Sequence, residues 1–261
     1  MPCRTPGGAL LVAMLFAATS FAAGTAQVRE QKSVVIGGQH ETWRLLWAAA
    51  PAAACAADEI EAALSCSCSG FAYGETGQLS LLRIPATGPG ETLELAQFYI
   101  AAATPAPPGS ALLQRWQPIP ASASDEDDDW HHASDFNFLK RVQARRTTDA
   151  MRIADYNHDG QASEFLLQVG VLPCGRPQLL LVGVSRRNPH LHVFAAADAG
   201  DQPLLMGPRA WAAVLKNPRA RQVVEWPCGT DADSVESVVD VEVRRGVFHL
   251  QRSERHCANP P

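Results

Sequence analysis

The sequence has no hydrophobic run beyond residue 26 that is long enough to cross a membrane, because a spanning helix needs about 20 consecutive apolar residues. It also has no excess of basic residues: 22 lysines and arginines stand against 27 aspartates and glutamates, giving a formal net charge of −5. A mildly acidic chain gives no electrostatic reason to bind nucleic acid or an anionic membrane surface. We therefore expect no nucleic-acid partner, and no transmembrane segment once the N-terminal segment is removed.

The common catalytic signatures are missing as well. The sequence contains no Gly-x-Ser-x-Gly elbow, P-loop, dinucleotide glycine fingerprint or His-Glu-x-x-His zinc motif. These absences favour a non-enzymatic role. The two carboxylates of a glycosidase, however, can lie far apart along a chain and leave no motif. An exported hydrolase acting on a carbohydrate or an ester is therefore the alternative.

Residues 1–26 are typical of a secretory signal peptide. Arg4 precedes an apolar core at Ala9–Ala18, and small residues follow as far as Ala26, which is the order of regions in such a peptide. We expect cleavage after Ala26. The alternative cleavage sites follow Ala22 and Ala23.

The rest of the chain is expected to be a single exported β-rich domain at residues 27–261, periplasmic or extracellular. Hydrophobic residues make up 46% of the sequence, which is enough for a packed core in a chain of this length. The proline-rich segment at residues 104–110 is the one candidate sub-boundary. It is too short to require two domains.

Removal of Cys3 with the signal peptide leaves an even number of cysteines. In an oxidising compartment this favours up to three disulfides, and no Cys-x-x-Cys motif indicates a metal or redox site instead. The pairing stays open among about fifteen possibilities, with a local bridge from Cys55 to Cys66 or Cys68 as a guess. The candidates are Cys55, Cys66, Cys68, Cys174, Cys228 and Cys257.

The hydrophobic pattern predicts a mainly β (α+β) fold with antiparallel hairpins, a few short helices and disulfide staples. Alternating apolar residues around glycine- or proline-containing turns indicate hairpins, and capped amphipathic stretches indicate helices. Hairpins are expected at Phe71–Ile84 and Phe165–Val184. Further strands are expected at Thr92–Ile100, Ala111–Pro118, His190–Ala195, Glu236–Arg244 and Val247–Arg252, and helices from Pro51 to Leu64 and from Ser134 to Met151.

The segment from Asp155 to Phe165 is the most specific chemical signal in the sequence. Asp155, Asn157 and Asp159 place side-chain oxygens at loop positions one, three and five, and Gly160 follows at position six. Oxygens that converge from a tight turn are what a hard cation such as Ca²⁺ requires. Asp, Asn and Gly also form ordinary turns, but strict alternation followed by glycine favours calcium.

This segment resembles the calcium loops of EF-hands, dockerins and FG-GAP blades. The resemblance implies that Asp155, Asn157 and Asp159 are side-chain ligands and that Gln161 supplies its backbone carbonyl. Position twelve, which is a glutamate in EF-hands, is leucine here. Glu164 or a remote acid is therefore expected to complete the ligand set. The resemblance covers about a dozen residues and implies a site, not a fold.

Two other groups of residues have side chains that can bind metals. Asp125–Asp129 is a run of five acids, which could supply a second cation site or an outer ligand but is more typical of a solvated loop. His190 and His192 alternate, so both would lie on one face of a strand, yet no third ligand has matching spacing. We interpret the acidic run as a solvated surface loop and the two histidines as ordinary strand residues.

The sequence therefore predicts an exported, disulfide-containing protein that binds Ca²⁺ and has a structural or binding role. The partner would be a protein or glycan of unknown identity.

Overall fold

The computed structural model describes most of the chain in eight segments. They are residues 25–54, 74–100, 107–115, 144–172, 176–197, 199–200, 202–228 and 235–257. The expected signal peptide up to residue 24, the acidic run Asp125–Asp129 and four of the cysteine candidates lie outside these segments. Within them, no helix has the length and apolarity needed to span a membrane.

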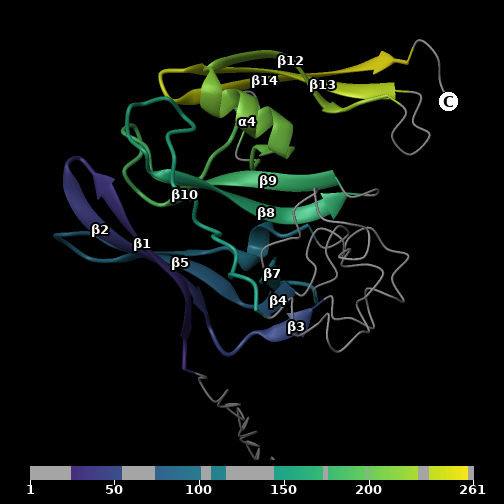
Figure 1. Ribbon diagram of the computed structural model, residues 1–261. Coiled ribbons are helices and arrows are strands. Elements are labelled where there is room, and N and C mark those ends of the chain that lie inside the picture. Colours follow the sequence, from purple (N-terminus) through teal and green to yellow (C-terminus); the bar gives the residue numbers. More distant parts are fainter. Residues whose placement is uncertain are drawn as a thin grey trace, which may run out of the picture.

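The fold is mainly β, as predicted, and every pairing between named strands is antiparallel. Figure 1 shows the sheets stacked above one another, with β8 and β9 in the middle. The first sheet has the order β1 (Gln27–Ile36), β2 (Gln39–Trp47), β5 (Leu79–Ile84), β6 (Glu91–Glu94). A small sheet has the order β3 (Ala52–Ala54), β4 (Gly74–Gly77), β7 (Ala111–Leu113). The middle sheet joins β8 (Glu164–Leu172), β9 (Arg176–Gly183), β10 (His192–Val193) and β11 (Leu205–Met206), and the last has the order β12 (Arg219–Trp226), β13 (Val235–Arg244), β14 (Val247–His256).

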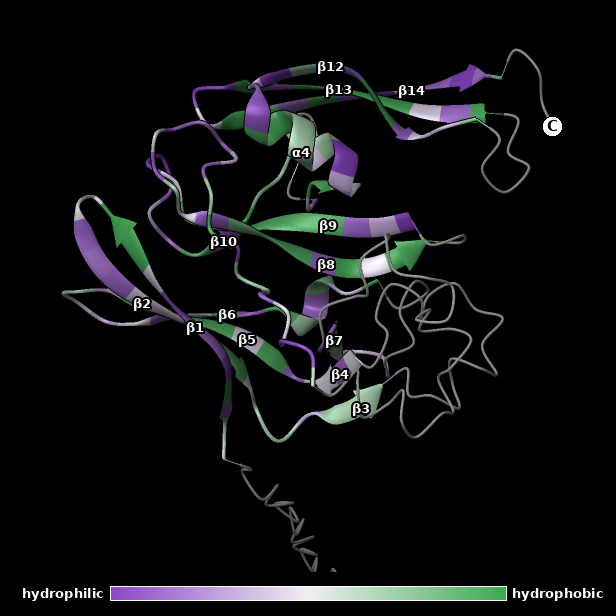
Figure 2. Ribbon diagram, viewed as in Figure 1, coloured by the Kyte–Doolittle hydropathy of each residue, from purple (hydrophilic) through white to green (hydrophobic). Residues whose placement is uncertain are grey.

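The β8–β9 hairpin separates two hydrophobic cores. Phe165 and Val182 on one of its faces pack into the first core, and Leu181 on the other face packs into the second. Because side chains alternate along a strand, a hairpin buried on both faces needs an almost continuous apolar sequence, and Figure 2 shows such colouring along most of both strands. This is why Phe165–Val184 was recognisable as a hairpin.

The first core lies between the hairpin and the β1–β2–β5–β6 sheet. Strand β2 contributes alternate residues, of which Trp43 and Leu45 are fully buried and Trp47 nearly so, and Leu79 and Leu81 of β5 lie in the same cluster. The period of two places Thr42 and Arg44 on the other face. The pattern Thr42–Trp47 is therefore that of a strand with one buried face.

The second core contains the one α-helix of the described segments, α4 (Pro208–Lys216). Gly207 caps its N-terminus and proline occupies the first turn, where the missing N–H group costs no hydrogen bond. Trp211 is fully buried and makes edge contacts with Tyr156 and Phe248, at ring-centroid distances of 5.8 Å in both cases. Figure 1 shows α4 between the β8–β9 hairpin and the β12–β13–β14 sheet. The sequence analysis did not predict this helix.

One disulfide joins the ends of the last sheet. Cys228 follows β12 and Cys257 follows β14, with their Cα atoms 5.7 Å apart. This confirms that the candidates include a disulfide pair. The suggested bridge from Cys55 lies outside the described residues, as does Cys174.

The predicted hairpin Phe71–Ile84 is wrong. Strand β4 pairs with β3 and β7, whereas β5 pairs with β2 and β6, so the two neighbouring strands belong to different sheets. A Cβ atom at Gly77 would meet the ring of Trp47 at 3.4 Å, which shows how closely the chain crosses the first sheet there. Burial of Leu79 and Leu81 against β2 decides the pairing, and the local glycine turn does not.

Two predicted helices also need correction within the described residues. Ala52–Ala54 forms strand β3, paired with β4, while Asp58–Leu64 lies outside. Residues 144–151 are not helical, because distant acceptors take their backbone N–H groups: Thr148 donates to the Arg115 carbonyl, and Met151 donates to the Glu30 carboxylate. The predicted strand at Thr92–Ile100 is short and continues as the 3₁₀ helix η1 (Ala96–Phe98).

Candidate metal centre

The loop that contains Asp155 leaves the middle sheet and returns to it at the start of β8. Ala154 and Glu164 form an antiparallel bridge, with N–H to carbonyl distances of 2.8 and 3.2 Å in the two directions. Tyr156 packs from inside the loop into the second core. The loop is therefore anchored by backbone hydrogen bonds at its base and by a buried aromatic ring.

Three of the predicted ligands converge on one turn. The Asp159 N–H lies 3.1 Å from Asp155 Oδ1 and 2.9 Å from Asn157 Oδ1, so one donor draws both oxygens together. The Gly160 N–H donates to Asp155 Oδ2 at 3.0 Å. Gly160 has φ +84°, a backbone conformation that favours glycine. The structure thus confirms the expected sharp turn at this position.

Asp159 and Gln161 link this turn to the surrounding chain. Asp159 Oδ1 accepts from the Gln161 N–H at 3.0 Å, and Oδ2 accepts from the Arg186 N–H at 2.7 Å. The Gln161 side chain accepts from the Gly37 N–H at 3.1 Å. Its backbone carbonyl, the predicted ligand atom, accepts from the Ser163 hydroxyl at 3.4 Å.

Glu164 lies fully buried beneath the loop. Its Oε2 accepts from the Tyr156 N–H at 2.9 Å, and its Oε1 lies 3.1 Å from Asn157 Nδ2 and 2.9 Å from the Ser163 hydroxyl. Burial raises the pKa of this carboxyl to about 8, more than these hydrogen bonds lower it. Glu164 therefore braces the loop from inside, and its predicted role as a metal ligand stays a prediction.

Acceptor capacity remains where a cation would bind. Each carboxylate oxygen can accept about two hydrogen bonds, and each Asp155 oxygen accepts one. Asp159 Oδ1 and Asn157 Oδ1 also accept one each. Free lone pairs therefore remain on all three of the predicted side-chain ligands.

The loop also concentrates negative charge. Asp155 and Asp159 supply two carboxylates, and within the described segments no lysine, arginine or histidine forms an ion pair with either of them. No set of three His, Cys, Asp or Glu side chains there is placed to hold a metal by itself. A cation at this loop would therefore also need the Asn157 amide oxygen and the Gln161 carbonyl, as oxygen-rich calcium sites do.

The loop touches elements from both cores. His158, at φ 52°, donates through Nε2 to the Val214 carbonyl near the end of α4, at 2.7 Å. Gly246, in the turn between β13 and β14, lies against Asp159, since a Cβ atom there would be 3.8 Å from the Asp159 Cβ. The contact with Gly37 reaches the turn between β1 and β2. One loop thus joins the helix and the turns of two separate sheets.

Sequence reasoning missed Gly183, which allows the loop to approach β9. A Cβ atom at this position would lie 2.2 Å from the Ser163 carbonyl oxygen, closer than any side chain can come. Glycine within a strand often marks such a close approach, so the signal was present in the sequence. Arg186, whose backbone binds Asp159, carried no recognisable signal.

The two histidines considered as a metal pair do not act together. His190 lies 2.8 Å from Glu91 Oε1 through its Nδ1 atom, whereas the His192 Nδ1 lies 2.8 Å from the His190 carbonyl oxygen. The His192 ring packs on Phe194 at 4.3 Å, and burial lowers its pKa. These contacts are those of ordinary strand histidines.

The chain matches no family model, no curated protein and no solved structure. The resemblance to calcium loops therefore stays a prediction made from the residues of the loop.

Proposed function

We propose that the protein is an exported β-rich protein that binds one Ca²⁺ ion in the Asp155–Gln161 loop. The observation that carries the proposal is the convergence of the Asp155 and Asn157 oxygens on the Asp159 N–H, in a loop whose carboxylates have no cationic partner among the described side chains. A divalent cation would offset this charge in a turn that already has the required shape.

The ligands in this proposal are Asp155, Asn157 and Asp159 through their side chains and Gln161 through its carbonyl. Glu164 holds the backbone beneath them through its buried hydrogen bonds to the Tyr156 N–H and the Ser163 hydroxyl. Because position twelve of the loop is leucine and supplies no bidentate acid, the affinity is expected in the weak range of extracellular modules, roughly 10⁻⁴ to 10⁻³ M. Such an affinity suits calcium levels outside the cell and is consistent with export.

The role of the ion would be structural. The loop contacts α4 and the turns of two sheets, so a cation that stiffens it would hold the two cores in a fixed relation. Binding to the folded state alone raises stability by mass action. A protein or glycan partner and the hydrolase alternative both stay predictions, and an activity screen on glycans and esters tests the latter.

The test is calorimetric titration of Ca²⁺ into the chelator-stripped mature protein, beside the Asp155→Ala/Asp159→Ala double variant. The parent should give a saturable signal and a rise in melting temperature, and the variant should give neither. Asp149→Ala is the matched control, because Asp149 is an exposed carboxylate bound to Lys32 outside the loop. If the parent protein shows no heat of binding and no stabilisation at millimolar calcium, the loop is an ordinary turn and not a calcium site.

A further inference from the structure

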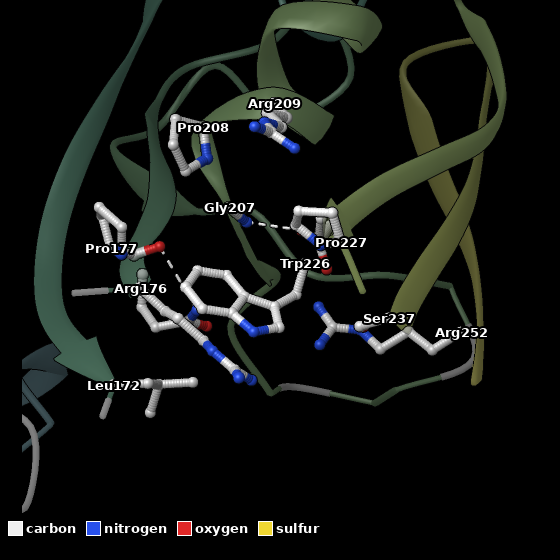
Figure 3. Close-up of a pocket in the computed structure, with 12 residues that line it drawn as sticks. Leu172, Arg176, Pro177, Gly207, Pro208, Arg209, Trp226, Pro227, Ser237 and Arg252 are labelled. Carbon is white, nitrogen blue, oxygen red and sulfur yellow. Dashed lines mark hydrogen bonds between the residues drawn. The ribbon is translucent and has the colours of Figure 1, made fainter. Parts of the chain in front are cut away.

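A cavity of about 290 Å³ lies at the other end of the β8–β9 hairpin. It is formed where β9 begins at Arg176, where α4 begins after Gly207 and where β12 ends at Trp226. Register pairing puts Arg176 opposite Leu172, and Glu164 opposite Gly183, so the cavity and the metal loop are separated by the length of the hairpin. Figure 3 shows the lining residues converging from several elements.

Trp226 at the centre of this cavity has an unsatisfied donor. Its indole Nε1 is buried and has no hydrogen-bond partner in the described part of the chain. Buried indole N–H groups normally find an acceptor. The Arg176 guanidinium stacks over the ring, 3.8 Å from its centroid, and Figure 3 shows the two side chains next to each other. The donor is covered by its neighbours, and a ligand oxygen could satisfy it only after a small shift of the ring or of the side chains around it.

The lining is positively charged although the whole chain is acidic. Three arginines face one glutamate, and Glu225 is already engaged, since its Oε1 accepts from the Gly207 N–H at 2.6 Å. Arg209 is exposed and forms no ion pair or hydrogen bond with any described residue, and Arg252 donates to the Leu205 carbonyl. The N-terminal end of α4 adds the partial positive charge of its free N–H groups. An anion would be attracted here.

The remaining walls are mostly apolar, with Gln178 and Ser237 as their polar residues. Three prolines and Leu172 line the cavity beside the Trp226 ring. Leu172 is 36% exposed and is one of five large apolar residues in the described segments that are exposed. Small-molecule sites typically combine such apolar walls with a few convergent polar groups. The volume is near the lower end of that class, which indicates a small ligand.

We propose that this cavity binds a small carboxylate whose body is flat and apolar. The carboxylate would lie toward Arg209 and Arg252, with one oxygen accepting from Trp226 Nε1 once that shift has exposed it, while the apolar body would lie against the prolines and Leu172. Guanidinium groups suit carboxylates in charge and in geometry. This binding activity goes beyond the proposed calcium site and uses none of its residues.

The test uses phenylacetate as the probe, its neutral analogue phenylacetamide, and inorganic phosphate. Binding to the full mature protein is followed by calorimetry and by tryptophan fluorescence. Phenylacetate should bind saturably, and both Arg209→Gln and Trp226→Phe should weaken it by about tenfold or more, the expected loss of one charge-assisted hydrogen bond. Arg187→Gln is the matched control, because Arg187 is exposed and lies outside the cavity.

Four results would contradict the proposal or a part of it. No saturable binding of phenylacetate at millimolar concentration would overturn it entirely. If phenylacetamide binds equally well, the cavity does not recognise the charge of the carboxylate. If phosphate binds equally well, the cavity does not recognise an apolar body. An equal loss in Arg187→Gln would show a general charge effect. If phenylacetate binds in the presence of chelator while the calcium titration gives no signal, the carboxylate site holds and the proposed calcium site fails. The two proposals can therefore fail separately.

Discussion

The two ends of the β8–β9 hairpin differ in charge and in how they are assembled. At one end, acidic side chains from one short loop are held by backbone N–H groups of the same loop. At the other end, arginines and a tryptophan come from β9, α4, β12 and β14. The first site is local in the sequence, and the second exists only because the last sheet packs across the helix.

The difference explains which site could be predicted. Loop positions one, three, five and six are a pattern in consecutive residues, and the turn at Gly160 follows from local backbone chemistry. The basic cavity has no motif, because Arg176, Trp226 and Arg252 are brought together only by strand pairing and by the packing of α4. A local site depends on its turn, whereas a composite site depends on the whole fold.

The largest loss of stability is expected from a substitution that adds a side chain between the loop and β9. Gly183→Ala places a Cβ atom 2.2 Å from the Ser163 carbonyl oxygen, so the backbone must shift, at a cost of about 3 kcal/mol in the free energy of unfolding. Chemical denaturation of the parent and the variant measures this difference in the free energy of unfolding. Gly207→Ala at the cavity end is the matched control: its Cβ would be 3.4 Å from the Glu225 carboxylate, and the loss should stay below about 1 kcal/mol. Equal losses at both glycines would contradict the close approach at Gly183.

A loss of similar size is expected when the disulfide beside the cavity is removed. Cys228 and Cys257 are 29 residues apart, and a cross-link of that length stabilises a fold by about 2 to 4 kcal/mol. Cys228→Ser/Cys257→Ser should lower the melting temperature and weaken phenylacetate binding, because β12 carries Trp226. Calcium binding at the far end should not change. A variant that loses calcium affinity as strongly as carboxylate affinity would show that the two ends are not independent.

The smallest effect is a pH dependence at the loop end, where His192 pairs with Gly183. Burial lowers the pKa of His192 below the usual value of 6.5. The unfolded chain therefore takes up a proton first as the pH falls, so stability contributed by the neutral ring is present above pH 6.5 and is lost below it.

Melting temperatures measured across this range test the prediction. His192→Phe keeps the ring contact with Phe194 and should flatten the decline between neutral pH and mildly acidic pH. An unchanged decline in this variant would assign the pH dependence to other groups.

Much of the fold followed from residue patterns, and the errors share one cause. The hairpin at β8–β9 was predicted because its two strands are neighbours in the sequence and their apolar residues alternate. The same alternation predicted β13 and β14 as strands. The hairpin at Phe71–Ile84 was wrong because β5 buries Leu79 and Leu81 against β2, a pairing across many residues. Helix α4 was missed because it is short and its apolar residues point to a core made by distant strands.

The candidate site was predictable to a similar extent. Asp155, Asn157 and Asp159 lie together as expected, because their spacing and Gly160 set the turn. The inward position of Glu164 could not be foreseen, since it depends on the bridge to Ala154 that begins β8. The contacts of the loop with Val214 and Gly37 required the packing of both cores.

Because the β8–β9 hairpin supplies residues to both cores, neither core can open without uncovering two strands that the other core needs. Heat or denaturant should therefore unfold the described sheets in one cooperative transition, with no intermediate in which only one core is melted. The pairing of β8 with β9 is also local, and local contacts form early in folding. The strands that join the two halves of the molecule would then be the template on which each half is assembled.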